Sequence, residues 1–222
     1  PKQREQVQFI EKAGQHLLEL INEVLDIAQI EAGRLKFSLK PVEVSQMLQS
    51  ALSLVQPLAA QRNLQIIPEL PNSDAYYVAA DQQRLTQVIL NLLSNAIKYN
   101  REGGSVTVSC QQPRVGRLRI SVSDTGEGIP AEKLERLFVP FDRLDAERRT
   151  TVQGSGLGLA LSWRLVEAMR GSMGVESTVG QGSTFWVELS LTQAPSQAKA
   201  GLADDEPDTV AGMLGVLLNK GR

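Results

Sequence analysis

The stretch NLLSNAIKYN, residues 91–100, has the spacing of an amphipathic helix with one polar face. Asn91 and Asn95 are four residues apart and Lys98 follows three residues later, so a helix places these side chains together. Two carboxamides beside an ammonium group would suit a magnesium–triphosphate, because an amide oxygen can ligate the metal and the lysine can contact an anionic oxygen. The pattern alone also fits a solvated helix face. Other segments of the sequence are needed to distinguish a ligand-binding face from a solvated one.

A glycine-rich segment, DTGEGIP at residues 124–130, comes directly after a predicted strand over residues 117–124. Gly126 and Gly128 allow a sharp turn and a close approach of a ligand to the backbone. An ionised Asp124 can only accept hydrogen bonds, so it could receive the exocyclic amine of adenine and would repel the carbonyl oxygen of guanine. The alternative is a tight turn with no ligand.

A second glycine-rich segment, GSGLGLALS at residues 154–162, leads into a predicted helix over residues 156–170. The free N–H groups and the positive end of a helix start can hold phosphate. No Lys-Ser/Thr pair follows the last glycine and no strand precedes the first, which excludes a Walker loop and a dinucleotide fingerprint.

Together with GQGSTFWVEL at residues 180–189, these segments resemble the N, G1 and G2 boxes of the ATP-binding domain of sensor histidine kinases. LFVPFDRLD, residues 137–145, resembles the F box of that family. The resemblance runs from about Ser45 to Leu191. It implies the α+β, two-layer α/β sandwich of Bergerat type that gyrase, chaperone and mismatch-repair ATPases share, here preceded by a long dimerisation helix. Predicted hairpins mixed with helices independently favour a layered α+β fold.

The resemblance also implies a role for each matching position, with ATP and Mg²⁺ as cofactors. Asn95 is the expected magnesium ligand, Lys98 and Arg143 are the expected catalytic phosphate contacts, and residues 142–153 correspond to the ATP lid. Arg148 and Arg149 are alternatives to Arg143. The full expected ATP-binding set is Asn91, Asn95, Lys98, Tyr99, Asp124, Gly126, Gly128, Ile129, Arg143, Gly154, Ser155, Gly156, Leu157, Gly158, Leu159 and Thr184.

Residues 3–32 form a long helical pattern that Gly33 ends. A helix of roughly 30 residues is about 45 Å long, too long for a small domain to cover its apolar stripe. We therefore expect a partner helix. By resemblance, residues 1–40 are the second helix of a dimerisation and phosphotransfer domain with its connector, and residues 41–192 are the catalytic domain.

The only histidine, His16, lies in this first helix. In the family, the phosphorylated histidine lies on the preceding helix and is followed by an acid and an Arg-Thr-Pro-Leu-like run. Here the sequence LLEL follows, without an acid directly after the histidine. We therefore interpret His16 as a structural residue, with the acceptor helix missing from this chain.

The last segment, residues 193–222, begins with the composition of a linker, and the part after it has two interpretations. LADDEPDTVAGMLGVLLNKGR resembles the opening of a receiver domain, with Asp204 and Asp205 at its acidic pair. It also fits a linker with an amphipathic helix.

The remaining segments give coarser expectations. Alternating Leu35, Phe37 and Leu39 predict a strand that Pro41 closes, and residues 44–62 predict a helix kinked or divided at Pro57. LQIIPEL at residues 64–70 predicts an edge strand because of its proline. Asp81 is the expected N-cap of the helix that contains residues 91–100.

The bulk composition is that of a soluble globular chain: 222 residues, 22% charged, with a net charge of −2. Dispersed Lys and Arg give no reason to expect nucleic-acid binding. Cys110 is alone, which excludes an internal disulfide. We find no signal peptide and no long apolar run, so we expect a cytoplasmic chain without direct membrane contact, in a parent that could be membrane-anchored.

The resulting hypothesis is the core of a two-component sensor histidine kinase, which passes the terminal phosphoryl group of ATP to a histidine and then to a response-regulator aspartate. Its expected partners are a receiver domain and, in the parent, a second copy bound through the dimerisation helices. Two alternatives are an ATP-binding interaction module without self-phosphorylation and a Ser/Thr kinase of the anti-sigma type; the long first helix disfavours the latter.

Overall fold

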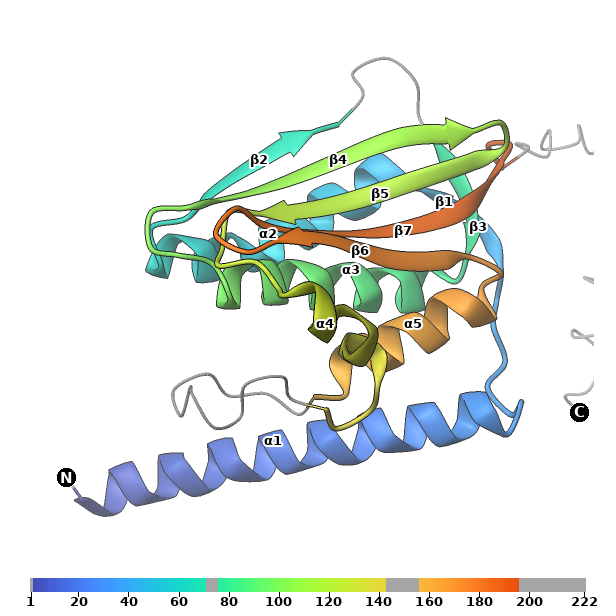
Figure 1. The fold of residues 1–222 in the computed structure, drawn as a ribbon. Coiled ribbons are helices and arrows are strands. Elements are labelled where there is room, and N and C mark those ends of the chain that lie inside the picture. The colour runs from blue at the N-terminus through green and yellow to red at the C-terminus, as the bar shows by residue number, and fades with distance from the viewer. Residues whose placement is uncertain (1, 71–75, 143–155, 196–222) are drawn as a thin grey trace, which may run out of the picture.

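The structure is a computed structural model that describes residues 2–70, 76–142 and 156–195, and its centre is a seven-stranded sheet (Figure 1). The strand order is β1-β3-β7-β5-β4-β2, and β6 pairs with β7 beside this path. All pairings are antiparallel except that of β2 with β4. The strands are β1 (Lys40–Glu43), β2 (Gln65–Glu69), β3 (Tyr77–Ala80), β4 (Ser105–Arg114), β5 (Arg117–Asp124), β6 (Ser172–Thr178) and β7 (Gly182–Thr192).

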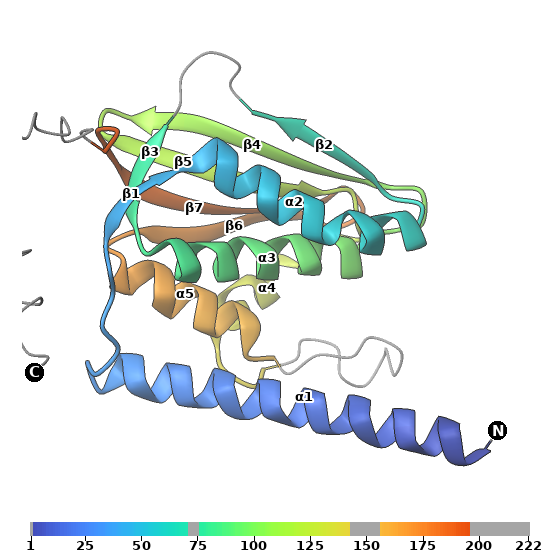
Figure 2. The same cartoon turned by 180° about the vertical axis from the view of Figure 1, so that it is seen from behind.

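Three helices cover one face of this sheet, as Figures 1 and 2 show from opposite sides. They are α2 (Val44–Gln61), α3 (Gln82–Lys98) and α5 (Gly158–Ala168). A short helix α4 (Ala131–Leu134) and a 3₁₀ turn η1 (Glu135–Phe138) follow β5. The core lies between the two layers, where side chains of helices and strands are fully buried, among them Leu48, Leu85, Ile89, Leu93, Ile120, Leu165 and Leu189. The two-layer α/β sandwich expected from the sequence is confirmed.

Helix α3 shows why the sequence folds as it does around the polar face of residues 91–100. Asp81 caps its start, because its carboxylate accepts a hydrogen bond from the backbone N–H of Arg84 at 3.2 Å. Leu85, Val88 and Ile89 then face the core, followed by Leu92, Leu93, Ala96 and Ile97 one and two turns later. The predicted cap is confirmed.

Two expectations in the first half of the chain differ from the structure, and one strand was not expected. The strand predicted around Leu35–Leu39 is wrong: strand pairing begins only at Lys40, because its partner β3 ends at Ala80. The backbone N–H of Ser38 donates to Asp81 at 3.0 Å instead. Helix α2 is not divided at Pro57 but continues through it, at an exposed turn; a kink at Pro57 stays a prediction. Strand β3 was not predicted, because four residues are too few to show a period.

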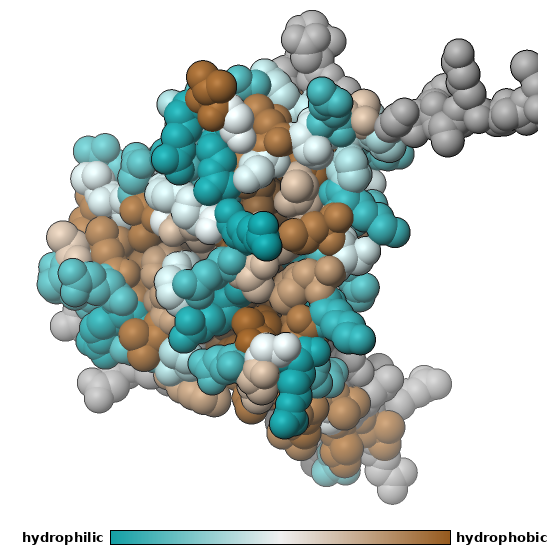
Figure 3. Space-filling model, turned by 90° about the vertical axis from the view of Figure 1, so that its right-hand side faces the viewer, coloured by the Kyte–Doolittle hydropathy of each residue, from teal (hydrophilic) through white to brown (hydrophobic). Residues whose placement is uncertain are grey.

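The first helix, α1 (Lys2–Glu31), extends well beyond the sandwich, so the long helix expected from the sequence is present. Its C-terminal part packs on the domain, where Arg84 of α3 forms a bidentate ion pair with Asp26 at 2.9 and 3.3 Å. On the N-terminal side of Asp26, several apolar side chains of α1 are exposed: Val7, Ile10, Leu17, Leu18, Ile21, Val24 and Leu25. Seen from the side, hydrophobic residues gather along the lower edge of the molecule, where α1 lies (Figure 3).

Across residues 2–70, 76–142 and 156–195, no helix combines the length and the apolar character that crossing a membrane requires.

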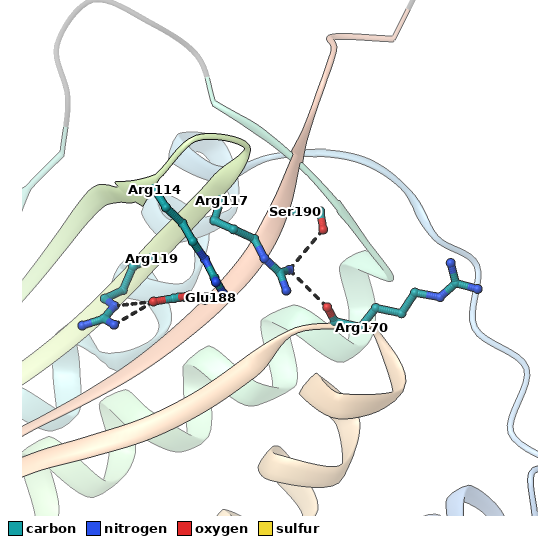
Figure 4. Close-up of polar contacts among 6 residues, drawn as sticks. All are labelled: Arg114, Arg117, Arg119, Arg170, Glu188 and Ser190. Atoms are coloured by element: carbon teal, nitrogen blue, oxygen red, sulfur yellow. Dashed lines mark hydrogen bonds and ion pairs between the residues drawn. The ribbon is translucent and has the colours of Figure 1, made fainter.

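On the sheet face away from the helices, a buried carboxylate joins β5 to β7 (Figure 4). Glu188 is 5% exposed and lies directly across from Arg119, whose guanidinium donates to it at 2.7 and 2.9 Å. The same guanidinium lies 4.1 Å from the centroid of the Trp186 ring. These contacts fix the register of the two strands that lead to Asp124 and its neighbours.

Replacing Arg119 with Ala is expected to lower the free energy of unfolding by about 2 kcal/mol, because it leaves the buried Glu188 carboxylate with a poorer partner. Arg117→Ala is the matched control, since Arg117 donates only to the neutral oxygens of Ser190 and Arg170, both at 3.1 Å. Urea unfolding measures both variants. Equal losses in the two variants would contradict the assignment.

Candidate functional site

The two carboxamides of α3 form a short hydrogen-bonded series. The side-chain nitrogen of Asn95 donates to the side-chain oxygen of Asn91 at 3.4 Å. The side-chain nitrogen of Asn91 in turn donates to the hydroxyl of Ser162 on α5 at 2.8 Å. The predicted amide face therefore points toward the start of α5, where the second glycine segment lies. Ser162 is a buried polar residue within an apolar helix, and no pattern in the sequence pairs it with Asn91.

The start of α5 approaches these amides closely only because residue 158 is glycine. A β-carbon at Gly158 would lie 2.6 Å from the side-chain oxygen of Asn91. Gly156 has a φ of 73° and accepts a hydrogen bond from the backbone N–H of Phe141 at 3.2 Å. Leu157 is buried and Leu159 packs against the core, so they anchor this end of the helix. Arg143, Gly154 and Ser155 lie outside the described residues, and their roles stay predictions.

The turn after β5 holds a carboxylate at the edge of the core. The Asp124 side chain accepts a hydrogen bond from the backbone N–H of Gly126 at 2.8 Å. Burial raises the pKa of Asp124 above its ordinary value, and hydrogen bonds from the backbone of Gly126 and Ser183 oppose that rise. A β-carbon at Gly126 would lie 2.5 Å from the carbonyl oxygen of Tyr99, so the turn packs directly on the end of α3.

The β6–β7 hairpin fastens the same turn from the other side. The backbone N–H of Ile129 donates to the hydroxyl of Ser177 at 2.8 Å, and the backbone N–H of Gly180 donates to the carbonyl of Glu127 at 2.7 Å. Gly128 has a φ of 71°, and a β-carbon there would collide with the carbonyl of Thr178. Gly126 is therefore required by the close packing of the turn, and Gly128 by both its positive φ and the close packing.

The residue of β7 that lies across from Asp124 is Ser183, which is not among the residues predicted from the sequence. Thr184, which is among those residues, pairs with Ser123, and the two hydroxyls are 2.9 Å apart. Successive strand residues face opposite sides of a sheet, so Ser183 shares the side of Asp124. The alternation of buried Ser183, Phe185 and Val187 was the signal available in the sequence. The role of Thr184 near a ligand stays a prediction.

Lys98 and Tyr99 end α3 between the amides and the Asp124 turn. The ammonium group of Lys98 lies 5.2 Å from the centroid of the Tyr99 ring, and Tyr99 is 47% exposed. The structure therefore brings the amide face, the lysine, the aromatic ring and the Asp124 turn together around the C-terminal half of α3.

The donor set determines which metal ion could bind. Within the described residues, no group of three or more His, Cys, Asp or Glu side chains is placed to hold an ion. A neutral amide oxygen such as that of Asn95 suits Mg²⁺ when phosphate oxygens and water supply the other ligands. The residues present therefore fit a magnesium ion that arrives with a polyphosphate, rather than a cation held by the protein alone.

Comparison with known proteins agrees with this geometry. Residues 80–193 match the sequence profile of the histidine kinase-, DNA gyrase B-, and HSP90-like ATPases. The chain is 37% identical over 205 residues to the sensor protein GacS of Pseudomonas syringae pv. syringae. This alignment covers 91% of the chain and 23% of GacS. It is 43% identical over 188 residues to the circadian input-output histidine kinase CikA of Synechococcus elongatus, with coverages of 84% and 25%. The chain thus spans about a quarter of the length of these relatives.

Among solved structures, the chain is similar to full-length ShkA, whose crystal structure is a complex with AMPPNP. The TM-score is 0.77 and the sequence identity 36%, over 87% of this chain and 40% of ShkA. The histidine kinase ThkA, crystallised in complex with the response regulator TrrA, has the same fold with a TM-score of 0.65 over 83% of this chain and 50% of ThkA.

Proposed function

Because this chain belongs to the family of histidine kinase-, DNA gyrase B-, and HSP90-like ATPases, we propose that it is the Mg-ATP-binding core of a two-component sensor histidine kinase. The observation that carries the proposal is the half-buried Asp124 carboxylate, packed through Gly126 on the end of the helix that presents Asn91, Asn95 and Lys98. The similarity to kinases named as sensors supports the same function.

In this proposal, Asp124 accepts the exocyclic amine of adenine and Tyr99 contacts the purine ring. Asn95 holds the magnesium ion, which would neutralise charge on the phosphates. Lys98 contacts a phosphate oxygen, and we assign Arg143 the same task. The terminal phosphoryl group passes to a histidine of the dimerisation helices and then to an aspartate of a response regulator. Catalysis then depends mainly on positioning and charge stabilisation.

Asn91 explains why such a site would transfer phosphate rather than release it to water. By resemblance, hydrolytic relatives have a glutamate at this position, which acts as general base. A carboxamide cannot accept a proton usefully at neutral pH. Here its two ends are also engaged with Ser162 and Asn95. We therefore infer that hydrolysis of ATP by this chain is slow.

We further propose that the parent protein is a homodimer in which the exposed apolar side chains of α1 pack against partner helices. We assign it a receiver domain as phosphate acceptor. The crystal structure of ThkA with TrrA supports that kind of partner. A nucleotide substrate favours a cytoplasmic location for this domain.

Labelled ATP tests this function and the role of His16. We expect the full chain to bind ATP without acquiring acid-labile label, and His16→Ala to bind ATP with unchanged affinity, because the acceptor is expected on another helix. Binding is measured by isothermal titration, and label by phosphoprotein gels of samples quenched with SDS and EDTA at alkaline pH, run with and without a later acid treatment. Binding without label also fits the alternative of an interaction module, whereas acid-labile label would support the kinase and reassign His16 as acceptor. Failure to bind ATP would contradict both functions.

A further inference from the structure

Helix α5 brings one hydroxyl group to the amide face of α3. Ser162 is 2% exposed, one helical turn after Gly158, and its oxygen accepts the hydrogen bond from the side-chain nitrogen of Asn91 at 2.8 Å. Its neighbours Leu161 and Leu165 belong to the hydrophobic core. A buried hydroxyl there has a specific partner rather than solvent.

The direction of α5 distinguishes the two ends of the Asn91 carboxamide. Its oxygen lies beside Gly158, in the first turn of α5, where free backbone N–H groups and the positive end of the helix favour an acceptor. Its nitrogen lies on Ser162, one turn farther along. The first turn of α5 therefore favours the oxygen end of the Asn91 amide at Gly158, and Ser162 holds the nitrogen end by accepting its hydrogen bond.

That orientation is passed on to Asn95. Because the oxygen of Asn91 is available on the Asn95 side, the nitrogen of Asn95 donates to it at 3.4 Å. The oxygen of Asn95 is then the end of that amide turned away from Asn91. A reversed Asn91 would offer its nitrogen instead, which would draw the oxygen of Asn95 inward and leave an N–H group where a cation has to bind.

We propose that Ser162 is a positioning residue for the magnesium ion, acting through Asn91 to keep the oxygen of Asn95 directed at the metal. The inference rests on the proposed function, in which Asn95 is the metal ligand. Outer-shell hydrogen bonds of this kind orient the ligands of metal sites, and their loss costs about tenfold or more in metal affinity.

The test is the affinity of the full chain for AMPPNP, titrated once with Mg²⁺ and once with EDTA. We expect Ser162→Ala to reduce the gain in affinity due to Mg²⁺ by about tenfold, while the affinity in EDTA stays within about twofold. Ser162→Thr keeps the hydroxyl and should restore most of the gain. Ser172→Ala, at the other end of the domain on β6, is the matched control and should leave both affinities unchanged. Melting without nucleotide shows that each variant is folded.

A double-mutant cycle tests whether Ser162 acts through Asn91. If it does, Asn91→Ala combined with Ser162→Ala loses no more of the magnesium gain than Asn91→Ala alone. Additive losses, or an unchanged magnesium gain in folded Ser162→Ala, would overturn the inference while leaving the proposed function intact. A wild-type chain that binds AMPPNP equally with and without Mg²⁺ would instead refute the metal assignment itself.

Discussion

Asp124→Asn is expected to lower the affinity for ATP by about 10- to 100-fold, because a charge-assisted hydrogen bond to the adenine amine is lost in a half-buried site. The variant keeps a side-chain oxygen that can accept the hydrogen bond from Gly126. The turn should therefore persist, and the loss should fall on the ligand. Isothermal titration with ATP and GTP measures the effect, and the preference for ATP should fall with the affinity.

The pKa of Asp124 gives a control on stability. Burial raises this pKa in the folded chain, so the folded state holds the proton to higher pH than the unfolded state does. The contribution of this group to stability is then greatest at low pH and declines as the pH rises through the raised value. At neutral pH the ionised carboxylate is a cost, so Asp124→Asn should not lower the melting temperature without nucleotide. A marked drop in that temperature would show that the aspartate is structural.

Asn95→Ala is expected to abolish most of the magnesium dependence of ATP binding, a loss of about 10- to 100-fold in the presence of the metal. The Asn95 side chain is half-buried, whereas its neighbours Leu92, Ala96 and Ile97 are buried in the core. The substitution removes an amide from a helix face and puts in a strong helix former, so the fold should be retained. Titrations with Mg²⁺ and with EDTA measure the change.

Ser94→Ala, on the same helix next to Asn95, is the matched control and should bind Mg-ATP like the wild type. If wild type and Asn95→Ala show the same ratio of affinities with and without Mg²⁺, then Asn95 is not the ligand. The metal would then have to be held by the phosphates and by other groups.

The sequence was sufficient for the parts of the fold that have a period or a punctuating residue. The apolar spacing of α1 and α3 and the Asp81 cap all predicted what the structure contains. Prediction failed where pairing partners decide: the alternation of Leu35 and Phe37 would suit a strand, but β3 is too short to extend a ladder to them. The sequence of a segment does not show how long its partner strand will be.

The same distinction applies to the site. Residues with unusual local requirements, such as Gly128 with its left-handed φ and Asp124 at a strand end, were recognisable in the sequence. Ser162 and Ser183 were not identified, because each matters through a residue far along the chain. The role of a serine cannot be predicted until its partner is known. These partners are determined by the packing of α5 on α3 and by the register of β7.

Strand β7 pairs with β3, β5 and β6, so it is the only described connection between β1-β3 on one side and β5-β4-β2 on the other. It is also the last of the described strands in the chain. A ribosome that has released residues 1–180 has therefore produced two sheet fragments with no common ladder. We expect cooperative folding to wait until Thr192 has emerged, since pairings so distant in sequence close slowly.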